Sequence, residues 1–206
     1  MSRAAVFLDR DGVLVEEIYY PETGEIEAPL RPEDVRLLPG AASATRVLAQ
    51  AGYALVLISN QAAYAKGKTS LRTLWLTHER FVALLAREGV MLDAVFYSFS
   101  HPNGIMPYFS GPSLERKPGP YNLIIAAAQL DLDLARSWLV GDRDTDAKCA
   151  ELAGVRAILV ENAKNPGGRP GDVVYVADLA AAAAMIAASD RREPALSATE
   201  LRTTGA

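Results

Sequence analysis

Short apolar runs that alternate with helical patterns constrain this chain more than any other feature of its sequence. The runs are hydrophobic on both faces and end at turn-forming residues, which is typical of strands in a parallel sheet covered by helices. The predicted strands are 4–8, 54–59, 93–98, 137–140, 156–160 and 173–176. The predicted helices are 41–51, 71–88, 120–130, 145–153 and 179–188. This alternation predicts an α/β fold, with a doubly wound, Rossmann-like parallel sheet flanked by helices.

Three stretches fall outside the alternation. Segment 16–39 is rich in Pro, Glu and Gly and is expected to form a hairpin flap and loop, and segment 99–116 is expected to be a long lid loop. The final stretch, 189–206, is polar and is expected to be a flexible C-terminal tail. Because the spacing leaves no room for a large cap domain, we expect a single domain over residues 1–188.

The composition argues against several classes of function. A net charge of −4 over 206 residues gives no basic footprint, which disfavours a nucleic-acid partner. Cys149 is the only cysteine, so an internal disulfide is excluded and a cysteine-based metal site is not expected. The sequence shows no signal segment and no apolar run of membrane-spanning length. We therefore expect a soluble cytoplasmic protein with no membrane partner, as a monomer or a small homo-oligomer.

Polar side chains follow several predicted strands, at the edge of the sheet where ligands of such folds bind. Asp9 and Asp11 follow the first strand, Ser59 ends the second, Lys117 precedes a helix, and an acidic cluster begins at Asp142. Carboxylates gathered at one edge repel one another unless a cation lies among them, and oxygen ligands suit Mg²⁺. A lysine and a hydroxyl beside the metal would hold a phosphoryl group. One carboxylate would then attack phosphorus and another would protonate the leaving oxygen.

The acidic residues also have plainer interpretations. Aspartates after a strand can cap a turn, and acids at a helix start suit the helix dipole. The presence of all the motifs favours a catalytic interpretation for Asp9, Asp11 and Asp142. Asp146 stands between the two interpretations, and Asp144 is better explained by the helix dipole.

Four short motifs carry a resemblance to a known family. The stretches FLDRDGVL, ISNQ, RKP and GDRDTDA occur in this order, each at a predicted strand end or helix start. Together they resemble the motifs of the haloacid dehalogenase-like phosphohydrolases, over about residues 4–188. The segments ISNQAAYAKGK, HPNG and RKPGP narrow the resemblance to the heptose-bisphosphate and histidinol-phosphate phosphatases, which work with little or no cap domain.

The resemblance implies roles for the acidic residues. Asp9 matches the nucleophile that becomes an aspartyl-phosphate, and Asp11 matches the general acid/base. Asp9 and the backbone carbonyl of Asp11 also belong to the implied Mg²⁺ site. Asp142 matches a direct metal ligand, and Asp146 matches a carboxylate on the metal side of the site.

The resemblance also implies how the substrate is held. Ser59 and Asn60 match the motif that holds the transferring phosphoryl group, and Lys117 matches the cation that neutralises the nucleophile and the phosphate. Three further cations match positions that contact the substrate or the rim of the site, namely Arg116, Arg143 and Lys66.

The chain departs from the subfamily in the lid loop. The subfamily commonly carries a zinc site there, with ligands in Cys-x-His and Cys-x-Cys pairs. The aligned positions in this chain are Ser98, Ser100, Ser113 and Glu115. No structural zinc is therefore expected, because thiolate and imidazole ligands are missing. We expect the loop to be ordered instead by its apolar side chains, which are Ile105, Met106, Tyr108 and Phe109.

These features predict a Mg²⁺-dependent phosphomonoesterase that acts through an aspartyl-phosphate on a small soluble phosphate. The leading substrate is D-glycero-D-manno-heptose 1,7-bisphosphate or a related sugar phosphate, and histidinol phosphate is the alternative. A catalytically silent protein that binds a phosphorylated ligand is an alternative of another class. A signalling receiver domain is disfavoured, because its phosphorylated aspartate ends the third strand, whereas the Asp-x-Asp pair here follows the first.

Overall fold

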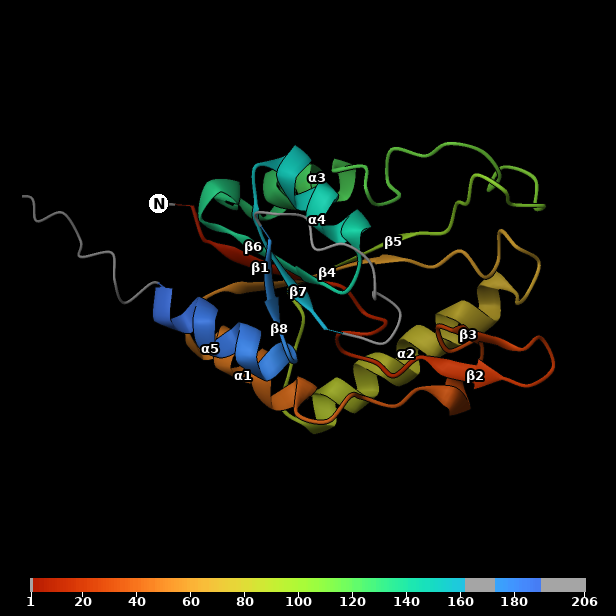
Figure 1. The fold of residues 1–206 in the computed structure, drawn as a ribbon, viewed down its shortest axis with the longest axis horizontal. Helices are drawn as coiled ribbons and strands as arrows, with labels where there is room; N and C mark the ends of the chain where they lie inside the picture. The colour runs from red at the N-terminus through yellow and green to blue at the C-terminus, as the bar shows by residue number, and fades with distance from the viewer. Residues whose placement is uncertain (1, 162–172, 190–206) are drawn as a thin grey trace, which may run out of the picture.

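The structure is built on a six-stranded sheet with the strand order β5-β4-β1-β6-β7-β8. This computed structural model describes residues 2–161 and 173–189 (Figure 1). The strands are β1 Ala5–Leu8, β4 Ala54–Asn60, β5 Ala94–Ser98, β6 Trp138–Gly141, β7 Arg156–Val160 and β8 Val174–Val176. Every neighbouring pair is parallel, so the predicted fold class is confirmed.

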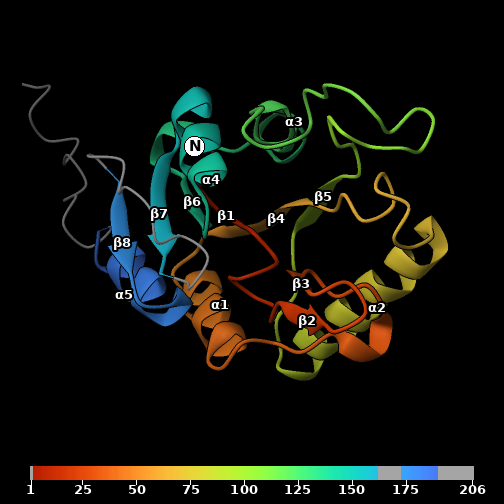
Figure 2. The same ribbon diagram turned by 45° about the vertical axis from the view of Figure 1, so that its right-hand side comes forward.

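Helices cover both faces of the sheet (Figure 1, Figure 2). One face packs against α1 Ala41–Gln50, α2 Leu71–Arg87 and α5 Leu179–Ser189, and the other against α3 Tyr121–Leu130 and α4 Asp144–Ala153. Leu48, Phe81 and Ile186 belong to the first core, and Leu123 and Cys149 to the second. The strands are therefore buried on both sides, which explains their uninterrupted apolar sequences.

The sheet changes its direction of growth at β1. Strands β4 and β5 extend it on one side of β1, and β6, β7 and β8 extend it on the other. Phe7 of β1 pairs with Val56 of β4 and with Leu139 of β6. Such a switch point opens a crevice beyond the carboxyl ends of the strands. Polar residues that follow β1, β4 and β6 therefore converge on one place.

The predicted strands and helices agree with the structure to within about one residue at each end. The sequence pattern did not predict two short 3₁₀ helices, η1 Pro32–Asp34 and η2 Leu134–Arg136. Elements of three residues are too short to leave a periodic signal. Of the expected tail, Ser189 is the last residue of α5, and 190–206 lie outside the described residues.

The segment between β1 and α1 contains an antiparallel hairpin, formed by β2 Ile18–Tyr20 and β3 Glu25–Glu27. The Tyr20 hydroxyl donates a hydrogen bond to Asp34 Oδ2 at 2.7 Å, which ties the hairpin to η1. Burial raises the pKa of Tyr20 to about 12, so this hydroxyl keeps its proton. Lys68 forms ion pairs with both glutamates of β3, so the hairpin is also fastened to the segment after β4.

Segment 99–116 contains no helix or strand and docks on the turn that follows β4. The backbone N–H groups of Ile105 and Met106 donate to the carbonyl of Ala65 at 2.7 and 3.2 Å. The ring of Phe109 packs edge-on against Tyr64, with the ring centroids 5.0 Å apart. Backbone hydrogen bonds and one aromatic pair thus order this loop.

The apolar residues of the loop do not all pack as expected. Tyr108 is 99% exposed, so the expectation that it packs the loop is wrong. Its backbone turns through the left-handed region at φ 66°, and its ring lies in solvent. Ile105 is also largely exposed, although its Cδ1 lies close to Gly67.

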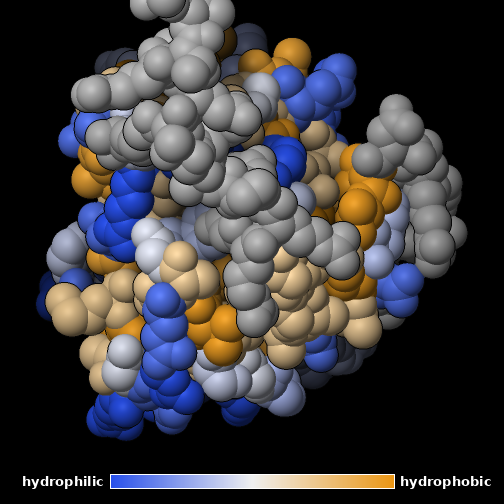
Figure 3. Space-filling view, turned by 90° about the vertical axis from the view of Figure 1, so that its left-hand side faces the viewer, coloured by the Kyte–Doolittle hydropathy of each residue, from blue (hydrophilic) through white to orange (hydrophobic). Residues whose placement is uncertain are grey.

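Figure 3 shows the side of the molecule that carries α5, at the left of Figure 1. Hydrophilic and hydrophobic residues are mixed over the coloured part of this side. Within residues 2–161 and 173–189, no helix has both the length and the apolar character needed to span a membrane.

Phe109→Ala is expected to loosen segment 99–116, because it removes the edge-on contact with Tyr64. An aromatic pair contributes about 0.5–1.5 kcal/mol, so proteolytic cleavage within the loop should quicken roughly 2- to 10-fold. Tyr108→Ala is the matched control and should leave the cleavage rate unchanged. A zinc chelator should also leave the rate of the unmodified protein unchanged, and faster cleavage after chelation would contradict this account.

Candidate active site

The residues predicted to form the site meet at the switch point of the sheet. Asp9 directly follows β1, Ser59 is the penultimate residue of β4, and Asp142 directly follows β6. They line a cavity of about 670 Å³. The predicted residues that line it are Asp9, Asp11, Ser59, Asn60, Lys66, Arg116, Lys117, Asp142 and Arg143. Asp146 is fully buried and contacts Lys117.

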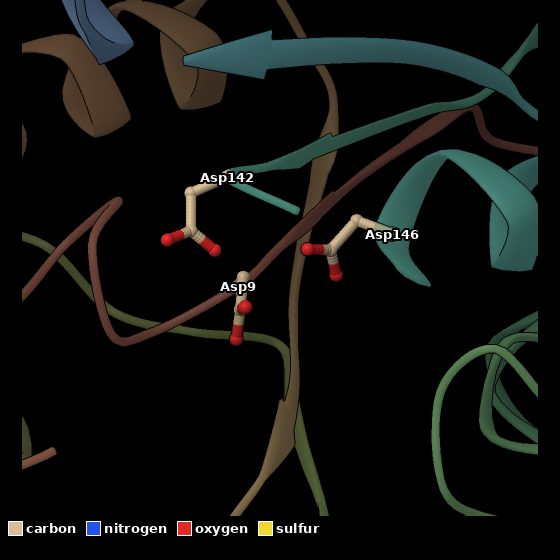
Figure 4. A group of neighbouring side chains, drawn as sticks. All are labelled: Asp9, Asp142 and Asp146. Atoms are coloured by element: carbon tan, nitrogen blue, oxygen red, sulfur yellow. The ribbon is translucent and has the colours of Figure 1, made fainter. Parts of the chain in front are cut away.

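Three buried carboxylates gather beside the cavity. One oxygen from each of Asp9, Asp142 and Asp146 lies within 4.8 Å of the others. Figure 4 shows the carboxylates of Asp142 and Asp146 turned toward Asp9, with the three side chains coming from the ends of β1 and β6 and the first turn of α4. The carboxylate of Asp11 does not belong to this group, so its predicted contribution to a metal site rests on its backbone carbonyl.

Lys117 is buried among these carboxylates. Its Nζ lies 2.8 Å from Asp9 Oδ2 and 2.6 Å from Asp146 Oδ1, and it donates to the carbonyl of Ile58 at 3.0 Å. Burial alone would lower the pKa of Lys117, but Asp146 and Asp9 raise it above its ordinary value. The ammonium group therefore stays charged at any physiological pH.

Asn60 fixes the backbone of Lys117. Its Oδ1 accepts a hydrogen bond from the Lys117 N–H at 3.0 Å, and its Nδ2 donates to the Lys117 carbonyl at 3.1 Å. Both ends of the amide are thus used to join β4 to the loop that carries the lysine. Its predicted contact with substrate stays a prediction, and its observed contacts hold Lys117.

Glycines make room for two of the carboxylates. A Cβ on Gly12, where φ is 81°, would lie 2.5 Å from Asp142 Oδ2. A Cβ on Gly141 would lie 2.3 Å from the Cβ of Asp146. Asp146 Oδ2 also accepts the backbone N–H of Arg143 at 3.1 Å, which caps the start of α4. Only glycine fits at either position without displacing a carboxylate.

The acidic cluster carries more negative charge than its surroundings neutralise. Burial, together with Asp9 and Asp146, raises the pKa of Asp142 to about 7. Three carboxylates face the single ammonium of Lys117, and Arg143 Nε lies 3.7 Å from Asp142 Oδ1 on a half-exposed side chain. A divalent cation would balance this excess. Because the donors are all oxygens, the cluster fits Mg²⁺ rather than a thiolate-seeking metal.

The rim of the cavity carries the remaining cations. Arg143 Nη2 pairs with Glu17 Oε1 at 2.9 Å, and Arg116 Nη1 donates to the carbonyl of Ser100 at 3.1 Å. Burial and the charge of Arg143 lower the pKa of Arg116, and both arginines line the same cavity. Lys66 lines the same cavity. An anion between these cations would relieve their repulsion.

Relatives of known activity resemble the chain closely. A family model described as HAD-hydrolase-like matches residues 114–185. A D-glycero-D-manno-heptose-1,7-bisphosphate 7-phosphatase of Thermosynechococcus vestitus is 42% identical over 165 residues, which cover 78% of this chain and 80% of that protein. The chain belongs to the haloacid dehalogenase-like phosphatases. A D-glycero-beta-D-manno-heptose-1,7-bisphosphate 7-phosphatase of Escherichia coli K12 is 34% identical, with 79% and 82% covered.

Solved structures of this phosphatase family share the fold. The D,D-heptose 1,7-bisphosphate phosphatase of B. bronchiseptica, complexed with magnesium and phosphate, matches with a TM-score of 0.76 and 30% identity. The match covers 90% of this chain and 99% of that one. A putative HAD-like phosphatase of Mesorhizobium loti also has a TM-score of 0.76, at 29% identity, with 91% and 86% covered. The chain is thus a phosphoric monoester hydrolase.

Sequence analysis missed two buried residues of this phosphatase. Arg10 and Gln61 are 2% and 3% exposed, and both contact the side chain of Asp11. Each lies beside a residue that was predicted, in FLDRDGVL and ISNQ. The only available signal was their place inside these motifs. The burial of Arg10 was not expected, because an arginine in a turn is ordinarily exposed.

Asp142→Asn is expected to stabilise the metal-free phosphatase at about pH 8. The Asp142 carboxyl has a pKa of about 7 when folded, against an ordinary value of 3.8, so ionisation is harder in the folded state. The unmodified protein therefore loses about 2–4 kcal/mol of stability between about pH 4 and pH 7, and the variant does not. Denaturant unfolding with a chelator present measures the difference.

The same experiment has an internal control. Below about pH 4 the carboxyl is protonated in both folded and unfolded protein, so the stability advantage of the variant should vanish. Equal stability of the two proteins at about pH 8, or an advantage that does not change with pH, would contradict the electrostatic account.

Proposed function

We propose that this phosphatase is a Mg²⁺-dependent enzyme that acts through an aspartyl-phosphate on D-glycero-D-manno-heptose 1,7-bisphosphate and removes the 7-phosphate. One observation carries the proposal. The buried ammonium of Lys117 lies 2.8 Å from Asp9 Oδ2, beside a cavity that Asp11 and Ser59 also line. The named activities of the relatives support the choice of substrate.

Residues of the chain supply the nucleophile and the proton transfers for both steps of the reaction, which are the formation and the hydrolysis of the aspartyl-phosphate. A carboxylate oxygen of Asp9 attacks phosphorus, the bond from phosphorus to the sugar oxygen breaks, and Asp11 gives its proton to that oxygen. Lys117 and the Ser59 hydroxyl stabilise the charge on the phosphoryl oxygens. Water then attacks phosphorus, Asp11 takes its proton, and the bond from phosphorus to Asp9 breaks to release phosphate.

The acidic cluster would hold the metal. Asp9 and Asp142 would bind Mg²⁺ through carboxylate oxygens, and the resemblance adds the backbone carbonyl of Asp11. Bound there, Mg²⁺ supplies positive charge to the phosphoryl oxygens. Asp146 is the weaker ligand candidate, because its two oxygens already contact Lys117 and the backbone N–H of Arg143.

The cations at the rim of the cavity favour a substrate that carries a second phosphate. We infer that Arg116, Arg143 and Lys66 hold the 1-phosphate while the 7-phosphate reacts at Asp9. An anion between Arg116 and Arg143 would relieve their mutual repulsion. Histidinol phosphate, the alternative substrate, has one phosphate and a cationic amine, which the same cations would repel.

Access to the cavity would be controlled by loops rather than by a cap. Ile26, Glu27 and Leu30 of the flap 16–39 line the cavity, and Arg116 ends the lid loop 99–116. We propose that these two segments belong to a single catalytic domain over residues 1–188. The expectations of a cytoplasmic enzyme, and of a monomer or small homo-oligomer, stay predictions.

Phosphate release with Mg²⁺ tests the proposal, over a panel of heptose 1,7-bisphosphate, heptose 7-phosphate and histidinol phosphate. We expect the bisphosphate to react best, and we expect release to vanish in Asp9→Asn or after chelation. Arg116→Met should lower kcat/KM for the bisphosphate by about 10-fold or more, since a hydrogen bond to a charged group contributes about 1.5–3 kcal/mol. Its effect on the 7-monophosphate should be several-fold smaller.

Arg72→Met is the matched control, because Arg72 is an exposed arginine of α2 outside the cavity lining. It should leave both kcat/KM values unchanged. Histidinol phosphate far ahead of the sugar phosphates would contradict the proposed substrate. Release that continues unchanged in Asp9→Asn would contradict the proposed nucleophile.

A further inference from the structure

Arg10 is among the largest fully buried side chains, and the roles proposed above do not use it. An arginine is almost never fully buried unless it is paired. Its Nε and Nη2 both lie 2.9 Å from Asp11 Oδ1, and Nη2 also donates to Gln61 Oε1 at 2.7 Å. Its guanidinium carbon lies 5.8 Å from the centroid of the Tyr97 ring. The buried charge is thus held by the proposed general acid/base and by one amide.

Gln61 completes this network from the end of β4. Its backbone N–H donates to the carbonyl of Ser98 at 2.7 Å, which fixes its place. Because an arginine has only donors, the Gln61 amide oxygen must face Arg10 and the amide nitrogen must face away. That nitrogen donates to Asp11 Oδ2 at 2.6 Å and to Ser59 Oγ at 3.0 Å. Arg10 thereby determines which end of Gln61 meets Asp11.

The network distinguishes the two oxygens of the Asp11 carboxylate. Arg10 Nε donates to Oδ1, and Nη2 lies at ion-pair distance from the same oxygen, so Oδ1 faces the guanidinium charge. Gln61 donates to one site on Oδ2, which leaves the other site on Oδ2 open. Because a proton on Oδ1 would meet the positive charge of Arg10, Oδ2 is the place for a transferable proton, and Asp11 lines the cavity. Ser59 Oγ accepts from Gln61, so its own proton is directed to another acceptor.

We propose that Arg10 and Gln61 are positioning residues, which orient the Asp11 carboxyl so that Oδ2 carries the proton of both half-reactions. This role rests on the proposed function of Asp11. As the bond from Asp9 to phosphorus forms and the ester bond breaks, the Oδ2 proton passes to the leaving oxygen. As water then bonds to phosphorus and the bond to Asp9 breaks, a proton of that water returns to Oδ2. Misorientation of this carboxyl slows proton transfer.

The choice of leaving group separates this role from general damage to the site. An alkyl phosphate, such as a sugar phosphate, needs a proton on its leaving oxygen. Dinitrophenyl phosphate needs none, because it releases a stable phenolate. The ratio kcat/KM reports the steps up to departure of the leaving group, so it excludes hydrolysis of the aspartyl-phosphate.

Gln61→Met keeps the length of the side chain and removes both polar ends of its amide. General acid catalysis contributes about 10²–10⁴-fold, so kcat/KM for the alkyl phosphate should fall by about 100-fold or more. With dinitrophenyl phosphate the fall should be less than about 10-fold, because the unassisted steps remain. Arg10→Lys keeps the charge but loses the planar fork that fixes the amide, and it should show the same selective loss. It serves as the second variant if Gln61→Met does not fold.

Thr77→Val is the control for lost stability alone. It removes a hydrogen bond of 2.8 Å from Oγ1 of the buried Thr77 to the Thr73 carbonyl, within α2 and outside the cavity lining. The ratio of kcat/KM values for the two substrates should not change in this variant. A changed ratio would mean that destabilisation alone gives selectivity, and it would overturn the positioning role.

Asp11→Asn, measured alongside, separates this role from the proposed function. A selective loss in Asp11→Asn and in the Arg10 and Gln61 variants supports the positioning role. A selective loss in Asp11→Asn alone overturns the positioning role and leaves the function of Asp11 standing. No selective loss in Asp11→Asn overturns the function of Asp11, and the positioning role falls with it.

Discussion

The ammonium group of Lys117 is the contact on which the rest of the site depends. It bridges Asp9, Asp146 and the carbonyl of Ile58 at 2.8, 2.6 and 3.0 Å. These partners belong to the end of β1, to α4 and to β4, so one buried cation joins three elements at the switch point of the sheet. Removing one partner of a buried ion pair typically costs about 3–5 kcal/mol. Lys117 is therefore a structural joint as well as the cation that would meet the phosphoryl group.

The crowded carboxylates of the site destabilise the metal-free protein. The carboxylates of the cluster outnumber the buried cation among them, and the pKa of Asp142 is raised to about 7 because of burial, Asp9 and Asp146. Gly12 and Gly141 keep space for this crowding, since a Cβ on either would strike a carboxylate. A divalent cation bound among the carboxylates would replace their mutual repulsion with attraction to the metal. Strain of this kind is typical of sites whose function needs concentrated charge.

Sequence pattern predicted the sheet and the place of Asp9, Ser59 and Asp142, because strands buried on both faces are uninterrupted apolar runs and their ends converge by topology. It could not predict that Arg10 turns inward, since that depends on its hydrogen bond to Gln61, which follows the neighbouring strand β4. It also could not assign the amide of Asn60 to the backbone of Lys117, 57 residues away in sequence. Local sequence gives the residue types of a site, whereas the choice of hydrogen-bond partner requires the tertiary arrangement.

The central claim is that a carboxylate oxygen of Asp9 takes the phosphoryl group, and trapping tests it most directly. The phosphatase would be quenched during turnover with Mg²⁺ and the heptose bisphosphate, then treated with borohydride, which reduces an acyl phosphate to an alcohol. Peptide mass spectrometry would then locate the reduced residue. The account predicts homoserine in place of Asp9, with Asp11 and Asp142 unmodified and with no reduction when substrate is omitted. Reduction at another aspartate, or none while phosphate is being released, would contradict it.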